Sequence, residues 1–293
     1  MGDFPQIGAG ERRLLNLKTE ACWSDHRFQE RAVLPAVEAL QVLADVCRSV
    51  RPELNLHRMG AARFDKFLAL PPDGGAIAAY CDLSTLPGGG LRAALLSRIQ
   101  AGAARIRRMV THAQVVFMPD DGSGSAEPFA PPARATGATF SVDPVRLYEA
   151  LVPFGPAYRN IVEPLVLDAG AARAVIQAPT HAGVAGSLGS PFVLDAAFHA
   201  ACVWAQRFAG VVAFPVGFAQ RHIATPTRPG QRYLAQVVWV GREGGTLLFD
   251  LKITDARDRH YEVLRGVAMR DVSGGRWVPP AWVRRGIPAE DQG

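Results

Sequence analysis

The chain has 293 residues, of which 48% are hydrophobic and 20% charged, so it encodes a folded protein and not a disordered one. Its 32 basic and 27 acidic side chains leave a formal net charge of +5, without the basic stripe and interleaved aromatic residues that mark a nucleic-acid-binding surface. Four cysteines lie far apart with no CxxC pair, which predicts neither a disulfide framework nor a metal site.

The first half of the chain is expected to be one unit, residues 15–118, behind a flexible N-terminus over 1–14. Apolar residues at three-to-four spacing predict a helix over 35–50. Pro35 suits its first turn, because the N–H that proline lacks has no partner at that position. Strands are expected at 62–70, 76–83 and 105–117, separated by turn-forming residues.

The second half is expected to form another unit, residues 141–275, after a linker over 119–140 that is rich in Pro, Gly, Ser and Ala. A short helix over 142–151 and a long one over 191–208 are predicted, the latter capped by Ser190 and opened by Pro191. Strands are expected at 232–240, 246–255 and 260–272. Residues 276–293 read as a tail.

The two halves repeat each other around their long helices. "PAVEALQVLA" (35–44) and "PFVLDAAFHA" (191–200) align without gaps, and each is a Pro-led apolar helix within a set of strands. The predicted fold class is therefore α+β, with two fused units that each wrap a sheet around a central helix.

One histidine and one carboxylic acid stand out within this repeat. His26 precedes the first helix and has Ala182 as its counterpart, whereas Asp195 in the second helix has Ala39. This pattern predicts one acid–base site shared between the halves, although His181 and Glu38, one residue off register, leave a second degenerate site open.

A histidine and an acid that face each other can serve as general base and general acid. The histidine is the natural proton acceptor, and an apolar environment is expected to raise the pKa of Asp195 so that it can donate. His199, one helical turn later, can orient Asp195, although the two could also form a self-contained core pair. The first N–H groups of the 35–50 helix, at Ala36 and Val37, are candidates for holding a carbonyl oxygen.

Three motifs carry a resemblance to the dehydratase family of polyketide and related fatty-acid synthases. "DHRFQERAVLP" resembles its HxxxGxxxxP motif, with Glu30 in place of the glycine. "DAAFH" resembles its Dxxx(Q/H) motif, and "FGPAYRN" its YGPxFQ motif with Phe154 for tyrosine. All three occur in the family order, and the resemblance spans roughly residues 12 to 273.

The resemblance implies a double hotdog fold and the dehydration of a β-hydroxyacyl thioester to an enoyl thioester. It makes His26 the base, Asp195 the acid and His199 the residue that positions Asp195. The expected substrate-binding residues are Pro35, Ala36, Val37, Phe154, Gly155, Pro156 and Tyr158. No metal and no resident cofactor are expected, because the acyl chain arrives on the phosphopantetheine of an acyl carrier protein.

The expected partners are the carrier protein and other synthase components, with no nucleic acid and no membrane. Because carrier proteins of this kind are acidic, Arg105, Arg107 and Arg108 form a hypothetical dock. The N-terminus has no apolar signal-peptide core, so a cytoplasmic location is expected, and a homodimer of the fused units would be unsurprising. Two alternatives stay open: a double-bond isomerase or cyclase on the same fold, and a non-catalytic module that binds an acyl chain or serves as a scaffold.

Overall fold

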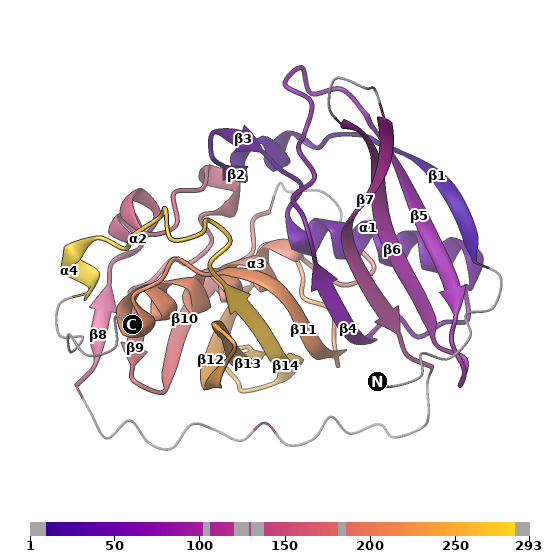
Figure 1. Ribbon diagram of the computed structural model, residues 1–293. Helices are drawn as coiled ribbons and strands as arrows, with labels where there is room; N and C mark the ends of the chain where they lie inside the picture. The colour runs from indigo at the N-terminus through magenta and orange to yellow at the C-terminus, as the bar shows by residue number, and fades with distance from the viewer. Residues whose placement is uncertain (1–9, 102–105, 120–128, 130–137, 181–185, 285–293) are drawn as a thin grey trace.

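The computed structural model describes residues 10–101, 106–119, 129, 138–180 and 186–284, and in these residues twelve strands form one continuous antiparallel sheet. Figure 1 shows one long helix against the strands of the first half and another against those of the second. A separate hairpin of β2 (Arg27–Phe28) and β3 (Arg31–Ala32) precedes the first of these helices. No helix in this part of the chain is long and apolar enough to cross a bilayer.

The first unit surrounds helix α1 (Ala36–Val50). Its strands are β1 (Glu11–Leu17), β4 (Arg58–Phe64), β5 (Ile77–Thr85), β6 (Leu91–Ala101) and β7 (Ile106–Phe117). They lie in the order β1-β5-β6-β7-β4. The predicted three-to-four spacing is what packs α1 on this sheet, since Leu40, Leu43 and Cys47 are all fully buried.

The second unit repeats this order around helix α3 (Pro191–Trp204). Its corresponding strands are β10 (Ala171–Gln177), β11 (Phe214–Ile223), β12 (Arg232–Glu243), β13 (Thr246–Thr254) and β14 (His260–Arg270). They lie in the order β10-β12-β13-β14-β11, and β9 (Leu165–Asp168) and β8 (Phe140–Val142) extend the sheet beyond β10. In both units the strand before the helix lies on one side and the strand after it on the other, which confirms the predicted duplication.

The two units are joined by strands β4 and β11, which pair antiparallel with Met59 opposite Arg221. Gln41 of α1 adds a buried polar link: its Nε2 donates to the Gly189 carbonyl at 2.7 Å, and its Oε1 accepts from the Leu188 N–H at 3.1 Å. Because its amide is bonded on both sides, this buried polar side chain ties α1 to the loop that enters α3.

Helix α3 is enclosed on every side, since all residues from Phe192 to Trp204 are buried. The helix predicted over 191–208 is confirmed, but its last turn, Ala205–Ala209, is a π-helix. Contrary to expectation, the Ser190 side chain makes no capping hydrogen bond to α3. Its backbone N–H instead donates to Thr227 Oγ1 at 3.0 Å. A helix enclosed in this way can hold a polar side chain only if another buried group compensates it.

The expected unit boundaries differ from the structure at both ends. Strand β1 begins at Glu11, so residues 11–14 belong to the sheet because they pair with β5. Most of the expected linker over 119–140 lies outside the described residues, and its last residue already belongs to β8. The first part of the expected tail is also folded, since Trp277 packs against Phe28 at 4.8 Å between ring centroids, and α4 (Ala281–Arg284) follows it.

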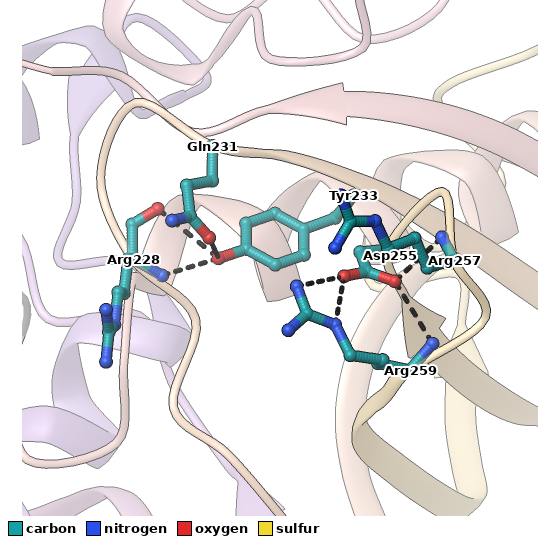
Figure 2. Close-up of polar contacts among 6 residues, drawn as sticks. All are labelled: Arg228, Gln231, Tyr233, Asp255, Arg257 and Arg259. Carbon is teal, nitrogen blue, oxygen red and sulfur yellow. Dashed lines mark hydrogen bonds and ion pairs between the residues drawn. The ribbon is translucent and has the colours of Figure 1, made fainter.

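Local sequence signals located the long helices and the strands β5, β7, β12, β13 and β14, but they gave no ranges for β1, β8, β9, β10 and β11. The strand expected over 62–70 is displaced, because β4 ends at Phe64. The sequence pattern also failed to indicate β6, whose run of apolar residues does not alternate cleanly with polar ones. The turn between β13 and β14 is held by Asp255, whose carboxylate accepts the N–H groups of Arg257 and Arg259 at 2.9 and 3.0 Å (Figure 2).

Candidate active site

A cavity of about 780 Å³ receives side chains from both units. His26 comes from the first unit, and Asp195 and His199 come from α3 of the second. Most of the remaining wall is apolar, including Leu34, Phe154 and Phe198. The cavity therefore brings together the three predicted catalytic residues and surrounds them with a surface suited to an acyl chain.

His26 is fixed by its own backbone and by two aromatic rings. It follows the short 3-10 helix Ala21–Asp25; its N–H donates to the Trp23 carbonyl at 3.1 Å, and its carbonyl accepts the Val33 N–H at 2.9 Å. The imidazole stacks on Phe154 at 4.2 Å between centroids and meets the edge of Tyr158 at 5.2 Å. The ring faces the cavity and is otherwise enclosed.

This enclosure decides the protonation state of His26. Burial lowers the pKa of His26 to about 4, against a smaller opposing effect of Asp195. The imidazole is therefore neutral at pH 7 and has a nitrogen lone pair that can accept a proton.

Asp195 and His199 form a close pair on α3. Asp195 Oδ2 lies 2.9 Å from His199 Nε2, and the two side chains are only 7% and 5% exposed. The two atoms are at ion-pair distance, and neither has any other hydrogen-bond partner among the described residues. The expected pairing of His199 with Asp195 is thus present as a contact between a carboxylate and an imidazole.

The expectation that the pKa of Asp195 is raised is wrong. Burial does raise it, but His199 and His26 outweigh burial, and the net pKa of Asp195 lies below its ordinary value. An apolar helix alone would have produced the predicted direction. The two imidazoles reverse it.

The ring of Phe154 contacts both imidazoles of the site, that of His26 and that of His199. Besides stacking on His26, its ring lies 5.2 Å from that of His199, tilted by 39°. Phe154 therefore separates the base from the acid pair with an apolar surface where the family motif has a tyrosine. The hydroxyl of the neighbouring Tyr158 is buried and has no hydrogen-bond partner among the described residues, and burial raises the pKa of Tyr158.

The start of α1 reaches the cavity through one of the two expected residues. Ala36 lines the cavity, while the Val37 side chain is 2% exposed and packs in the core. Glu38 and Ala39 donate their N–H groups to the Pro35 carbonyl, so the N–H groups of Ala36 and Val37 precede the first intrahelical hydrogen bonds. Ala36 is accordingly the better-placed donor for a carbonyl oxygen.

Among the other expected substrate-binding residues, only Phe154 lines the cavity. The lining does not include Pro35, Gly155, Pro156 or Tyr158. The dock expected at Arg105, Arg107 and Arg108 is described only in part: Arg105 lies outside the described residues, the Arg107 side chain is not described, and Arg108 is exposed on β7.

Other residues at the cavity were not predicted. Lys66 and Arg276 are exposed cationic residues on its lining, and Phe28, Phe67 and Trp277 form an aromatic cluster there. Nothing in the sequence near Lys66 or Trp277 marks them, because they meet only through the tertiary fold. In the π-helical turn after α3, Gln206 reaches the cavity and donates to the Leu151 carbonyl at 2.9 Å.

Glu30, which stands where the motif has glycine, adopts a left-handed backbone conformation with φ of 64°. It lies in the turn between β2 and β3, and its carbonyl accepts a hydrogen bond from Arg27 at 3.2 Å. A side chain in this conformation is strained, whereas glycine is not. The turn, and not the chemistry of the site, thus explains the glycine of the motif.

Replacement of Glu30 by glycine is expected to stabilise the protein by about 1 kcal/mol, because it relieves this strain. Urea unfolding of Glu30→Gly and wild type measures the difference. The same change at exposed Glu149 in α2 (Pro144–Ala150) is the control, and it should destabilise by about 1 kcal/mol because that backbone is helical. A loss of stability in both variants would contradict the strain at Glu30.

Comparison with known proteins assigns the chain to a family. The family model for the polyketide synthase dehydratase N-terminal domain matches residues 126–276, just over half of the chain. The chain belongs to the polyketide synthase dehydratase family. This family comprises the dehydratase domains of polyketide synthases.

The chain also resembles a subunit of a large synthase and several solved domains. It is 29% identical over 232 residues to one of the subunits of a polyunsaturated fatty acid synthase from Thraustochytrium sp., a match that covers 69% of this chain but only 7% of that protein. The dehydratase domain of a mycocerosic acid synthase-like polyketide synthase has a TM-score of 0.69 and 20% identity, covering 92% of this chain and 94% of that one.

A third relative is the dehydratase domain of PpsC from Mycobacterium tuberculosis, whose structure is in complex with C12:1-CoA. It has a TM-score of 0.64 and 22% identity, covering 90% of this chain and 97% of that one. At these identities the solved structures establish a shared fold. With the duplicated topology, they confirm the double hotdog implied by the sequence.

Proposed function

We propose that the protein dehydrates 3-hydroxyacyl thioesters carried on an acyl carrier protein, with His26 as base and Asp195 as acid. The observation that carries this proposal is the placement of a neutral imidazole from one unit and a carboxyl–imidazole pair from the other in a single apolar cavity. A base and an acid held in this way can act on adjacent carbons of one substrate.

In the proposed reaction, His26 removes the proton from the α-carbon of the acyl chain. The electron pair of that C–H bond forms the new C=C bond as the bond from the β-carbon to the hydroxyl oxygen breaks. The proton shared by Asp195 and His199 passes through Asp195 to the departing oxygen, which leaves as water. The proton on His26 then returns to the Asp195–His199 pair after the products leave, so the site is restored.

The negative charge that develops on the thioester oxygen needs a hydrogen-bond donor. The N–H of Ala36 supports this role, because it lies in the first turn of α1 and its residue lines the cavity. The added methyl of Ala36, relative to glycine, leaves that N–H in place.

The proposed substrate arrives on phosphopantetheine, and the proposed partners are a carrier protein and other synthase components. The exposed cations Lys66 and Arg276 on the cavity lining support the approach of a phosphate-bearing arm from that side. We propose no metal and no resident cofactor for this reaction. Among the described residues, no group of three or more His, Cys, Asp or Glu side chains is arranged to hold a metal.

The test is a mass-spectrometric assay of 3-hydroxyacyl thioesters incubated with the protein. Loss of one water, which depends on both His26 and Asp195, is expected. A parallel assay offers an enoyl thioester, since movement of its double bond without loss of water would identify an isomerase. No turnover of either substrate would overturn the proposal in favour of a binding module.

Reversal of charge at the proposed dock is expected to affect only carrier-bound substrates. The double variant Arg107→Glu, Arg108→Glu should lower kcat/KM about ten-fold for substrate on an acidic carrier protein and leave a short thioester mimic unaffected. Arg257→Glu, an exposed arginine in the β13–β14 turn, serves as control. Equal losses on both substrates would contradict docking at this cluster.

A further inference from the structure

We propose that Asp25 is a positioning residue, which clamps the loop 154–158 of the second unit onto His26 of the first and so encloses the catalytic imidazole. The inference deepens the proposed function, because it rests on His26 as the base. It concerns the residue immediately before His26, whose side chain points away from the reaction and toward the loop.

Asp25 holds the loop through two hydrogen bonds. Its backbone carbonyl accepts the Gly155 N–H at 2.8 Å, and its Oδ2 accepts the Ala157 N–H at 2.9 Å. The two amides flank Pro156, which begins the 3-10 helix Pro156–Tyr158. A main-chain acceptor and a side-chain acceptor of one residue thus bind both sides of a single turn.

Gly155 is required by the closeness of this contact. A β-carbon at Gly155 would collide with Cγ and Oδ1 of Asp25. The Gly155 backbone is in an extended conformation with φ of −72°, which any residue adopts, so the glycine is not there for its backbone freedom. It is there because no other residue lets the loop come this close to Asp25.

The clamp places two aromatic rings around His26. Phe154, just before Gly155, stacks on the imidazole at 4.2 Å with 21° between the planes, and Tyr158 at the other end of the loop meets it edge-on at 5.2 Å. Phe154 is held from the other side by Arg159, whose Nε donates to its carbonyl at 2.8 Å. Since Asp25 and His26 are consecutive, the hydrogen bonds of the first fix the rings against the second.

Asp25→Ala is the direct test, read out by NMR titration of the His26 imidazole and by kinetics on a short thioester mimic. Loss of the hydrogen bond to Ala157 should loosen Phe154 and admit water to His26. The pKa of His26 should then rise from about 4 toward 6.5. We expect kcat to fall about ten-fold with KM nearly unchanged, because the base is less well placed.

Two variants separate the clamp from charge and from general stability. Asp25→Asn keeps an oxygen that can accept the Ala157 N–H, so it should restore both the titration and kcat. Asp255→Ala loses similar bonds from a carboxylate to backbone N–H groups in the β13–β14 turn (Figure 2), and it should leave the His26 titration unchanged. The His26 resonance is assigned from its disappearance in His26→Gln.

Gly155→Ala approaches the same contact from the loop and serves if Asp25→Ala does not fold. Its β-carbon should push the loop from Asp25 and raise the His26 titration in the same direction. Unchanged titration and kcat in a folded Asp25→Ala, or in Gly155→Ala, would overturn the clamp. If the pKa of His26 rises in Asp25→Ala and His26→Gln nevertheless keeps full activity, the clamp stands and His26 is rejected as the base.

Discussion

Asp195→Asn is expected to lower kcat for dehydration about a thousand-fold while KM changes little, because an amide of nearly the same shape cannot deliver a proton to the departing hydroxyl. Steady-state kinetics on a 3-hydroxyacyl thioester mimic measures this effect. Asp45→Asn is the matched control: Asp45 is an exposed helical residue on α1 that accepts a hydrogen bond from Ser187 at 2.6 Å. The asparagine oxygen can keep that bond, so kcat should not change.

The Asp195–His199 contact adds a second arm to this experiment. If the two residues hold one proton jointly, His199→Gln should also lower kcat, and the double variant should lose much less than the product of the two single losses. If the loss of kcat in the double variant equals the product of the two single losses, His199 acts independently of Asp195. Retention of more than a tenth of wild-type kcat in Asp195→Asn would remove it as the acid.

The fold was largely predictable because its main signal is local. Three-to-four spacing located α1, and Ser190 with Pro191 marked the start of the apolar helix α3. The alignment of the two helix sequences indicated the duplication that the strand orders confirm. The predicted division of His26 and Asp195 between the units also held in space, since both line one cavity. Two helices related by a repeat must lie in equivalent places, so the sequence could place these residues without knowing the sheet.

The features that sequence could not supply depend on contacts between distant residues. Trp277 was assigned to a tail because nothing near it in the sequence shows that Phe28 will cover it. Asp25 and Gly155 are likewise far apart in the chain, and the motifs that contain them do not show that they touch.

The pKa of Asp195 could not be predicted for a different reason. It is the balance of burial, which raises it, against two imidazoles, which lower it. The sequence identified all three residues but not the distances between them. The sign of the shift depends on those distances.

His26→Gln is expected to abolish dehydration, with kcat reduced about a thousand-fold, because glutamine cannot accept the α-proton. The same variant should be less sensitive to acid than wild type. The wild-type pKa of His26 is lowered to about 4, whereas an unfolded histidine titrates near its ordinary 6.5. Between these two pH values the unfolded chain binds more protons than the folded one. The contribution of His26 to the free energy of unfolding is therefore present above pH 6.5 and is lost as the pH falls to 4.

This loss amounts to about 3 kcal/mol for a shift of this size, and His26→Gln should not show it. Urea unfolding at pH 7 and pH 4.5 measures the difference, and His260→Gln, at an exposed position on β14, should keep the wild-type dependence. Equal losses on acidification in all three proteins would mean that His26 is not held neutral by its enclosure. The low pKa would then explain neither the base nor the acid sensitivity. If instead only His26→Gln resists acid, then the packing of Phe154 and Tyr158 that keeps the base unprotonated also makes the fold sensitive to acid.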